Sequence, residues 1–292
     1  MKMSKLALGL WNMGDGSFHP LLSPIEGKKI IKSAIKKGIT SFDSAFSYKN
    51  ADNLLSSTIK EMNVERSSIE IATKIMPVPT LKKKFETVKH RLSTEYVDAL
   101  LLHWPTKETE LYKSLKELEE ILNKKEAREI GVSNFPLSLL KKVALDFPIT
   151  IHERPLSLLW SNTWEEEKEL GLKTYAYSPL GMGILAKEGD YCFNDSRKNL
   201  FIFNEGKDEY KALRDEMYAI KNEYDISYSD IAFSWLMHKK PESIIFGASS
   251  ESHLDKHIIT IPDEVISRLD KLSAKLGQKA PKDNIFSHNY DI

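Results

Sequence analysis

The sequence lacks several features that would direct it to particular classes of protein. It has one cysteine, Cys192, so it cannot form an internal disulfide, and no residue set has the spacing of a zinc site. No apolar run approaches the roughly 20 residues that a membrane-spanning helix needs. The apolar run near the start is interrupted by Gly9 and Asn12, too short for the core of a signal peptide. We therefore expect a cytoplasmic protein without a structural metal.

The chain also lacks an excess of charge of either sign. It has 42 basic and 42 acidic residues among 292, so its formal net charge is zero. Proteins that bind nucleic acid or a membrane surface in a general way need a basic excess. We therefore expect neither partner. With 41% hydrophobic residues, the chain can bury a sizeable core.

Short apolar runs alternate with amphipathic, helix-like stretches along the chain, without a linker. This alternation is typical of a parallel sheet. Eight units predict a closed (β/α)8 TIM barrel, in one domain over residues 1–292. An open doubly wound sheet is the alternative, but the glycines of "GLWNMGDG" lack the G-x-G-x-x-G spacing. The strand-like runs are residues 5–10, 38–43, 68–74, 96–104, 127–134, 149–153, 172–180 and 243–249.

Two further segments complete the prediction of the fold. The region that follows residue 180 is expected to be long and irregular, whereas residues 263–277 have the pattern of an amphipathic helix that closes the barrel.

Polar side chains close four successive apolar runs at a regular interval. Asp43, Lys74, His103 and Ser133 are separated by 31, 29 and 30 residues. One β/α unit has about 30 residues, so these side chains are expected at the same end of the sheet. In a barrel that is the C-terminal end, where active sites are built.

Three of these groups and a nearby tyrosine are chemically complementary. Tyr48 follows Asp43 by five residues. A tyrosine with a pKa near ~10 is a poor acid at neutral pH, but an ammonium such as that of Lys74 lowers this pKa. A neutral His103 can donate a hydrogen bond to a carbonyl oxygen and orient it. Without such chemistry, Asp43 and Lys74 would form a structural ion pair, and the other two would only pack.

The motifs that carry these residues resemble those of the aldo-keto reductase family. They are "LALGLW", "FDSAFSY", "ATK", "VDALLLHWP", "REIGVSNF", "YSPLGMGIL" and "SIIFGAS", in this order from Leu6 to about residue 260. The resemblance implies a (β/α)8 barrel and an NAD(P)H-dependent reductase of aldehydes or ketones. By this resemblance, Tyr48 is the general acid, Lys74 and Asp43 tune it, and His103 orients the carbonyl.

The resemblance also implies a nicotinamide cofactor, usually NADPH, with NADH as the alternative. Ser133 and Asn134 match the residues that hold the nicotinamide carboxamide, and Tyr177 matches the aromatic residue that stacks on its ring. Glu153 stands where the family has a glutamine that faces the carboxamide. An ionised glutamate accepts hydrogen bonds but donates none, so this change bears on cofactor affinity.

The rest of the cofactor site is expected in two loops. Ser178 and Leu180 match the loop over the pyrophosphate, and Gly247 and Ser249 lie in the segment near the adenosine phosphate. His253 and His257 stand where the family often has an arginine and an asparagine. Histidine does not clamp a phosphate as arginine does, so a preference for NADPH over NADH is less secure here.

The substrate pocket and the state of assembly are less constrained. Trp11, Trp104 and Trp160 lie at or after strand ends and are candidates to line the carbonyl pocket. About five residues precede "LALGLW", too few for the β-hairpin with which the family closes the barrel floor. We expect a monomer or a weak oligomer with a small carbonyl substrate. The alternative function is a catalytically weak, nicotinamide-binding regulatory or scaffold protein.

Overall fold

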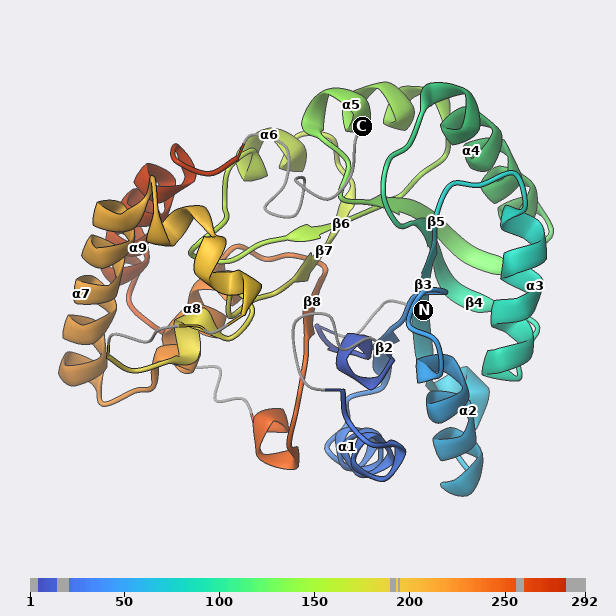
Figure 1. Ribbon diagram of the computed structural model, residues 1–292, viewed down its shortest axis with the longest axis horizontal. Helices are drawn as coiled ribbons and strands as arrows, with labels where there is room; N and C mark the ends of the chain where they lie inside the picture. The colour runs from blue at the N-terminus through green and yellow to red at the C-terminus, as the bar shows by residue number, and fades with distance from the viewer. Residues whose placement is uncertain (1–4, 15–20, 190–192, 194, 256–259, 282–292) are drawn as a thin grey trace.

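A computed structural model describes residues 5–14, 21–189, 193, 195–255 and 260–281. Eight parallel strands form a closed barrel in chain order, with β1 paired to both β2 and β8 (Figure 1). The predicted (β/α)8 barrel is confirmed, and the open sheet is wrong. The strands are β1 (Leu6–Gly9), β2 (Ser41–Asp43), β3 (Glu70–Ile75), β4 (Val97–Leu102), β5 (Ala127–Ser133), β6 (Ile151–Pro155), β7 (Lys173–Tyr177) and β8 (Ser243–Phe246).

Helices surround the barrel and begin where the sequence supplies caps. Helix α1, for example, starts at a capping box of Ser23 and Glu26, with Pro24 at its first position. The closing helix α9 has the predicted bounds and packs beside α7 (Figure 1). The α-helices are α1 (Pro24–Lys36), α2 (Ala51–Glu61), α3 (Leu81–Leu92), α4 (Glu108–Asn123), α5 (Leu137–Asp146), α6 (Trp164–Lys168), α7 (Lys207–Tyr224), α8 (Tyr228–His238) and α9 (Asp263–Gly277).

The region after β7 is not irregular throughout, contrary to the prediction. It contains α7, which buries Leu213, Met217 and Ile220 at helical spacing. It also contains α8, which begins at a capping box of Ser227 and Asp230. Short 3-10 helices occur at Trp11–Met13, Arg66–Ser68, Ile184–Ala186, Ser196–Asn199, Phe201–Phe203 and Glu251–Leu254.

The core lies in two layers because side chains alternate along each strand. The outward layer packs the strands on the helices, with Phe42 and Leu100 among its fully buried members. The inward layer fills the barrel with smaller side chains, including Ala72 and Ala99 beside Tyr175.

Polar groups occupy the N-terminal end of the barrel interior. The Ser41 hydroxyl donates a hydrogen bond to Glu70 on the neighbouring strand. Lys173 Nζ lies 2.5 Å from a Glu129 oxygen. The first strand that the structure describes, β1, is itself a barrel strand. The pairs Ser41–Glu70 and Lys173–Glu129 thus lie at the N-terminal end of the barrel, the end that the family's β-hairpin is expected to close.

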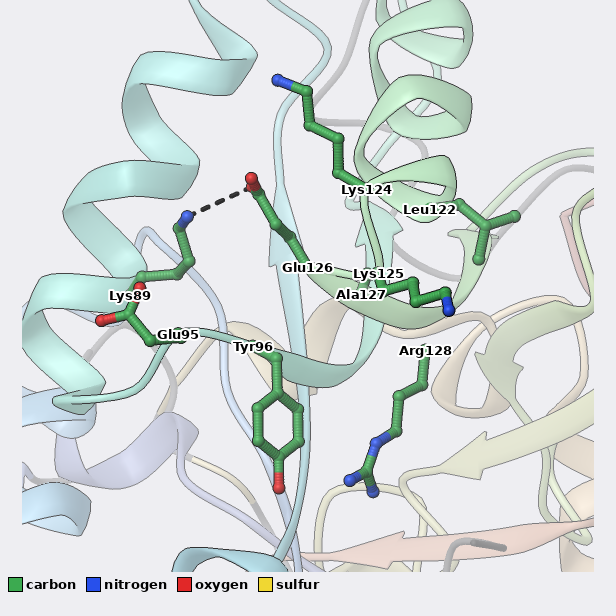
Figure 2. A pocket seen from close by; sticks show the side chains of 9 residues that line it. All are labelled: Lys89, Glu95, Tyr96, Leu122, Lys124, Lys125, Glu126, Ala127 and Arg128. Atoms are coloured by element: carbon green, nitrogen blue, oxygen red, sulfur yellow. Dashed lines mark hydrogen bonds and ion pairs between the residues drawn. The ribbon is translucent and has the colours of Figure 1, made fainter.

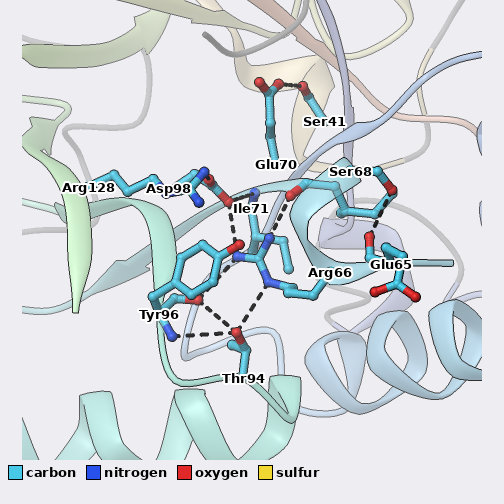
Figure 3. A network of polar contacts seen from close by, with 11 residues as sticks. Ser41, Glu65, Arg66, Ser68, Glu70, Ile71, Thr94, Tyr96, Asp98 and Arg128 are labelled. Atoms are coloured by element: carbon cyan, nitrogen blue, oxygen red, sulfur yellow. Dashed lines mark hydrogen bonds and ion pairs between the residues drawn. The ribbon is translucent and has the colours of Figure 1, made fainter. Parts of the chain in front are cut away.

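A second polar network ties three strands together at the same end of the barrel. The Asp98 carboxylate accepts hydrogen bonds from Arg66 Nη2 at 2.9 Å, Arg128 Nη1 at 2.6 Å and the Ile71 amide at 2.9 Å. Figure 3 shows this network, and the guanidinium carbons of both arginines lie 4.3 and 4.4 Å from the centre of the Tyr96 ring. Because these groups come from β3, β4 and β5 and from the short 3-10 helix before β3, they fix the strand ends relative to one another.

Among the described residues, no helix is both long and apolar enough to cross a membrane.

Candidate active site

The opposite end of the barrel interior gathers the side chains that the spacing singled out. Register pairs Asp43 with Ala72 and Ser133 with Glu153 on adjacent strands. Lys74 follows Ala72 by two positions, so it faces the same interior. The predicted placement of these strand ends at one end is therefore confirmed.

Lys74 is the buried centre of this cluster. Its Nζ lies 2.6 Å from each carboxylate oxygen of Asp43 and 3.1 Å from Oε1 of Glu153. All three residues are buried. Burial alone would lower the pKa of Lys74, but Asp43 and then Glu153 raise it well above its usual range. Lys74 is thus a permanent cation held between two carboxyl groups.

Glu153 contacts the proposed catalytic lysine, a relation that the sequence did not predict. Its other oxygen, Oε2, is buried and has no hydrogen-bond partner in the part of the chain that the structure describes. Burial, and then the charge of Asp43, raise the pKa of Glu153 to about 8. Burial also raises the pKa of Asp43, against the attraction of Lys74. The alternation of β6 could have indicated an inward glutamate, but not its partner.

Tyr48 and His103 lie over this cluster. Lys74 Nζ is 5.8 Å from the centre of the Tyr48 ring. The ring centres of Tyr48 and His103 are 6.0 Å apart, and the rings are nearly perpendicular, at 78°. Burial, and then the charge of Lys74, lower the pKa of His103 to about 3. His103 is therefore a neutral imidazole, which can donate one hydrogen bond and accept another.

Backbone hydrogen bonds fix the turn that carries Tyr48. The Phe46 amide donates to the carbonyl oxygen of Lys74 at 2.8 Å, and the Tyr48 amide donates to that of Ala45 at 2.9 Å. At the start of α2, the buried Asp52 accepts a hydrogen bond of 2.6 Å from the Ser44 hydroxyl. The strand end therefore positions Asp43 while this turn brings Tyr48 back over it.

Asn134 connects three of the residues assigned to the site. Its Nδ2 donates to the carbonyl oxygen of His103 and to Ser133 Oγ, both at 3.0 Å. Its Oδ1 accepts a hydrogen bond of 2.6 Å from the Tyr177 hydroxyl. The positive φ of Asn134, 65°, is a conformation that asparagine adopts more readily than most residues. The residues predicted to hold the nicotinamide are thus brought together.

The loop after β7 begins with two sharp turns next to Tyr177. Ser178 has a positive φ of 54°, and its carbonyl oxygen accepts from the Gly181 amide at 2.8 Å. The Leu180 carbonyl oxygen accepts from the Leu185 amide at 3.0 Å. Both predicted residues therefore lie directly after the C-terminal end of β7.

Four cofactor-binding residues were predicted in the segment after β8, and the structure describes three of them, Gly247, Ser249 and His253. Gly247 follows the strand, and a β-carbon there would meet no atom within 4 Å. His253 Nδ1 accepts a hydrogen bond from the Ser249 amide at 3.3 Å and lies 3.2 Å from its hydroxyl. Because an amide N–H can only donate, Nδ1 of His253 carries no proton in this arrangement. His257 lies outside the described residues.

The three tryptophans that were candidates for the substrate pocket lie in different surroundings. Trp104 follows β4, and its ring centre is 6.4 Å from that of His103. Trp11 is half-buried in the short helix after β1. Trp160 packs in the core, edge-on to Phe201 at 6.0 Å between ring centres. Trp104 is therefore the tryptophan whose contact with the polar cluster is established.

One pocket lies at the other end of the barrel. It has a volume of about 670 Å³ and borders the N-terminal ends of β4 and β5 (Figure 2). Lys89 and Glu126 form an ion pair there, with 3.2 Å between Nζ and Oε2. Lys89 is buried, but most of the charged side chains around this pocket are exposed, whereas Asp43, Lys74 and Glu153 at the C-terminal end are all buried. Buried, paired charges are the more costly arrangement, so we assign the candidate site to the C-terminal end. The residues that line the pocket are Lys89, Glu95, Tyr96, Leu122, Lys124, Lys125, Glu126, Ala127 and Arg128.

The polar groups at the C-terminal end suit a carboxamide. An amide group has two N–H donors and a carbonyl acceptor. Ser133 Oγ can accept or donate, the Asn134 amide can do both, and Oε2 of Glu153 is buried without a hydrogen-bond donor in the described part of the chain. Residues that fit a nicotinamide are therefore present on β5 and β6. Among the described residues, no group of three or more His, Cys, Asp or Glu side chains is placed to hold a metal ion.

The closed parallel barrel with its surrounding helices makes this a (β/α)8-barrel protein, and its buried ionic cluster lies at the face where such barrels build their active sites. The chain belongs to the aldo/keto reductase family, whose model matches residues 5–274.

The chain is similar along most of its length to two named proteins and to one solved structure. "Probable aldo-keto reductase 1" of Glycine max is 27% identical over 282 residues, covering 88% of this chain and 80% of the relative. "Probable voltage-gated potassium channel subunit beta" of Arabidopsis thaliana is 25% identical over 314 residues, covering 96% and 94%. The crystal structure of a thermostable aldo-keto reductase with the inhibitor epalrestat superposes with a TM-score of 0.76 at 26% identity, covering 92% of this chain and 94% of that one.

Membership of this family supports an oxidoreductase that acts on small carbonyl compounds. Members of the family generally use a nicotinamide cofactor.

Proposed function

We propose that this protein reduces an aldehyde or ketone to an alcohol with NADPH or NADH, and that Tyr48 is the general acid. The observation that carries the proposal is the position of Lys74. Its ammonium is held 2.6 Å from Asp43 and lies 5.8 Å from the Tyr48 ring centre. A fixed cation at this distance favours the phenolate and so lowers the pKa of the phenol.

Each side chain has a distinct task in the proposed reaction. Neutral His103 donates a hydrogen bond to the carbonyl oxygen and directs it toward the Tyr48 hydroxyl. Tyr48 gives its proton to that oxygen as the negative charge develops there. Lys74 stabilises the phenolate that remains, while Asp43 keeps the ammonium in place. The low pKa of His103, about 3, keeps it a neutral donor throughout the physiological range.

The cofactor would lie across the C-terminal ends of strands β5 to β8 and the loops that follow them. When bound there, a reduced nicotinamide would supply the hydride for the carbonyl carbon. We assign its carboxamide to Ser133, Asn134 and Glu153, with Tyr177 beside the ring. The remainder of the dinucleotide is assigned to the loops that contain Ser178, Leu180, Gly247, Ser249 and His253.

Trp104 forms one wall of the proposed carbonyl pocket. It is 7% exposed and lies beside His103, so a bound carbonyl group would meet its ring. Trp11, after β1, is assigned to the same pocket. Large aromatic walls favour substrates with an apolar portion next to the carbonyl.

The test combines binding and turnover. NADPH and NADH are titrated separately against the protein by nicotinamide fluorescence, and reduction of a panel of aldehydes and ketones is then followed. We expect cofactor binding and turnover, and a 10²–10⁴-fold lower turnover for Tyr48→Phe, the range typical of a lost general acid. Full activity of Tyr48→Phe would refute the acid role, and failure of both cofactors to bind would refute the reductase.

A second function is favoured by one relative, which is named as a potassium channel subunit and matches 96% of this chain. Cofactor binding without turnover of any carbonyl compound in the panel would favour a regulatory or scaffold protein. The intact group of Asp43, Tyr48, Lys74 and His103 supports the reductase.

A further inference from the structure

Two carboxyl groups share one cation at the centre of the candidate site. Asp43 contacts Lys74 Nζ through both of its oxygens at 2.6 Å, and Glu153 contacts it through one oxygen at 3.1 Å. Asp43 is 4% exposed, Glu153 2% and Lys74 1%. With all three ionised, the buried cluster would carry a net charge of −1. An uncompensated buried charge costs several kcal/mol, so the cluster favours retention of one proton.

The geometry indicates which carboxyl group retains the proton. Asp43 makes the two shorter contacts with the cation, so its charge is the better stabilised. Glu153 makes the single longer contact, and its Oε2 has no hydrogen-bond partner among the described residues. A carboxylate oxygen that is buried without a donor is poorly stabilised. The raised pKa of Glu153, to about 8, has the same origin, first in burial and then in the charge of Asp43.

The residues directly beside Glu153 on the neighbouring strands are not cations. Its register partner on β5 is Ser133, and its partner on β7 is Tyr175. Burial raises the pKa of Tyr175 above its usual range, so this residue is a neutral phenol. Across the barrel, the titratable groups that face Glu153 are Asp43 and Lys74, and the Asp43 carboxyl group lies within hydrogen-bonding reach of Glu153.

Two further titratable groups lie near Lys74. Tyr48 lies over its ammonium, and His103 is neutral because its pKa is lowered to about 3, by burial and then by Lys74. Neither therefore balances a charge on Glu153 at neutral pH.

We propose that Glu153 works as a neutral carboxylic acid, with Oε1 accepting from Lys74 and the Oε2 hydroxyl donating to the carboxamide of the bound nicotinamide. This inference rests on the proposed function. A protonated glutamate has one acceptor and one donor, the same pattern as a glutamine side chain, whereas an ionised glutamate has no donor. The proton thus gives Glu153 the hydrogen-bonding capacity that an amide would have at this position.

The proposal makes cofactor affinity depend on pH. When Glu153 ionises, it loses the donor to the carboxamide. Its new charge also offsets the effect of Lys74 on Tyr48, because the ammonium then faces two carboxylates. Cofactor binding therefore requires a proton on Glu153 and weakens as pH rises through the pKa of this residue. Above that pKa, linkage predicts about a tenfold increase in Kd for each pH unit.

The test measures the Kd of NADH from about pH 6.5 to about pH 9.5 for three proteins. NADH is chosen because it has no 2′-phosphate to titrate. We expect the Kd of the unaltered protein to rise at alkaline pH and that of Glu153→Gln to stay constant. Glu129→Gln is the matched control, because it removes a carboxylate at the opposite end of the barrel interior. It should keep the pH dependence of the unaltered protein.

Calorimetry in buffers of different ionisation enthalpy gives an independent readout that a merely structural role of Glu153 would not move. At about pH 9, the unaltered protein should take up close to one proton per NADH bound, and Glu153→Gln should take up none. A constant Kd and no proton uptake in the unaltered protein would overturn the inference while leaving the proposed function intact. An equal slope in Glu153→Gln would also overturn it. If NADH and NADPH both fail to bind at every pH, the proposed function itself is refuted.

Discussion

Gly14 lies directly against the backbone carbonyl group of Tyr48. A β-carbon at position 14 would be 1.6 Å from the Tyr48 oxygen and 2.4 Å from its carbonyl carbon. The φ of Gly14 is −137°, which other residues adopt readily. Glycine is therefore needed here for space and not for its conformational freedom, and it lets the loop after β1 approach the turn that carries the proposed acid.

We first predict that Gly14→Ala impairs turnover. The added methyl group must displace the backbone of Tyr48, and a misplacement of about 1 Å can cost roughly 100-fold in rate. Steady-state kinetics with one aldehyde would check this. Gly277→Ala is the control, since its β-carbon would meet its nearest neighbour at an ordinary 3.7 Å. Equal rates for the two variants would show that the contact does not position Tyr48.

A second prediction concerns the ionic cluster. Lys74→Met leaves Asp43 and Glu153 buried without their cation, and loss of one partner from a buried pair costs about 3–5 kcal/mol. Urea denaturation should show this loss in the free energy of unfolding. Adding Asp43→Asn to Lys74→Met should restore part of it, because the carboxyl group that carries the buried negative charge is then replaced by a neutral amide.

Lys168→Met is the control for that measurement. Lys168 pairs with Glu165 at the surface, and exposed pairs contribute about 0–1 kcal/mol. If Lys74→Met is as stable as Lys168→Met, the cluster does not carry the buried charge described above.

A third prediction uses the pH dependence of stability at Asp52. Burial raises the pKa of Asp52 to about 6, against the hydrogen bond from Ser44. The folded protein then holds this proton more tightly than the unfolded chain. The stabilisation is fully present below the ordinary pKa of about 4 and is lost as pH rises through about 6.

Asp52→Asn removes this ionisation. The stability of Asp52→Asn minus that of the unaltered protein should grow between about pH 4 and about pH 7, by an amount on the order of 3 kcal/mol. Urea denaturation at several pH values measures it. Groups common to both proteins cancel in the difference. For the exposed Asp208→Asn the difference should stay flat, and a flat difference for Asp52→Asn would contradict the buried ionisation.

A fourth prediction concerns the choice of cofactor. Nδ1 of His253 accepts from the Ser249 amide, so this side chain does not offer the double donor of a guanidinium. We expect the affinities for NADH and NADPH to lie within about tenfold. His253→Arg should tighten NADPH by more than tenfold, since hydrogen bonds to charged groups contribute about 1.5–3 kcal/mol, and leave NADH unchanged.

Fluorescence titrations of both cofactors check this prediction. His238→Arg, at the exposed end of α8, adds the same charge elsewhere. An equal gain for NADPH in both variants would point to general attraction and not to a site at His253.

The barrel and the pairing of Asp43 with Lys74 could be predicted from the sequence. Strand spacing near 30 residues and alternation along each strand determine which end and which face a side chain occupies. Helices α7 and α8 were missed although their apolar spacing and capping box are present. They lie together between β7 and β8, and an eightfold count of strand-helix pairs has no place for a second helix.

The contact between Glu153 and Lys74 could not be predicted in the same way. β6 and β3 are not neighbours, so no register rule relates them. Which side chains meet across the barrel depends on the stagger and tilt of all the strands between them. The cost of burying a charge would have indicated only that the inward-facing carboxylate of Glu153 needs a cation or a hydrogen-bond donor beside it. The roles of the cofactor residues stay predictions.

The network of Asp98 with Arg66 and Arg128 lies at the barrel end opposite the candidate site (Figure 3). It fixes the N-terminal ends of β3, β4 and β5, and the loops after the C-terminal ends of these strands take no part in it. Substitutions in those loops can therefore accumulate during evolution without loosening the strand ends. A lineage of such barrels can acquire new substrates while its scaffold stays unchanged.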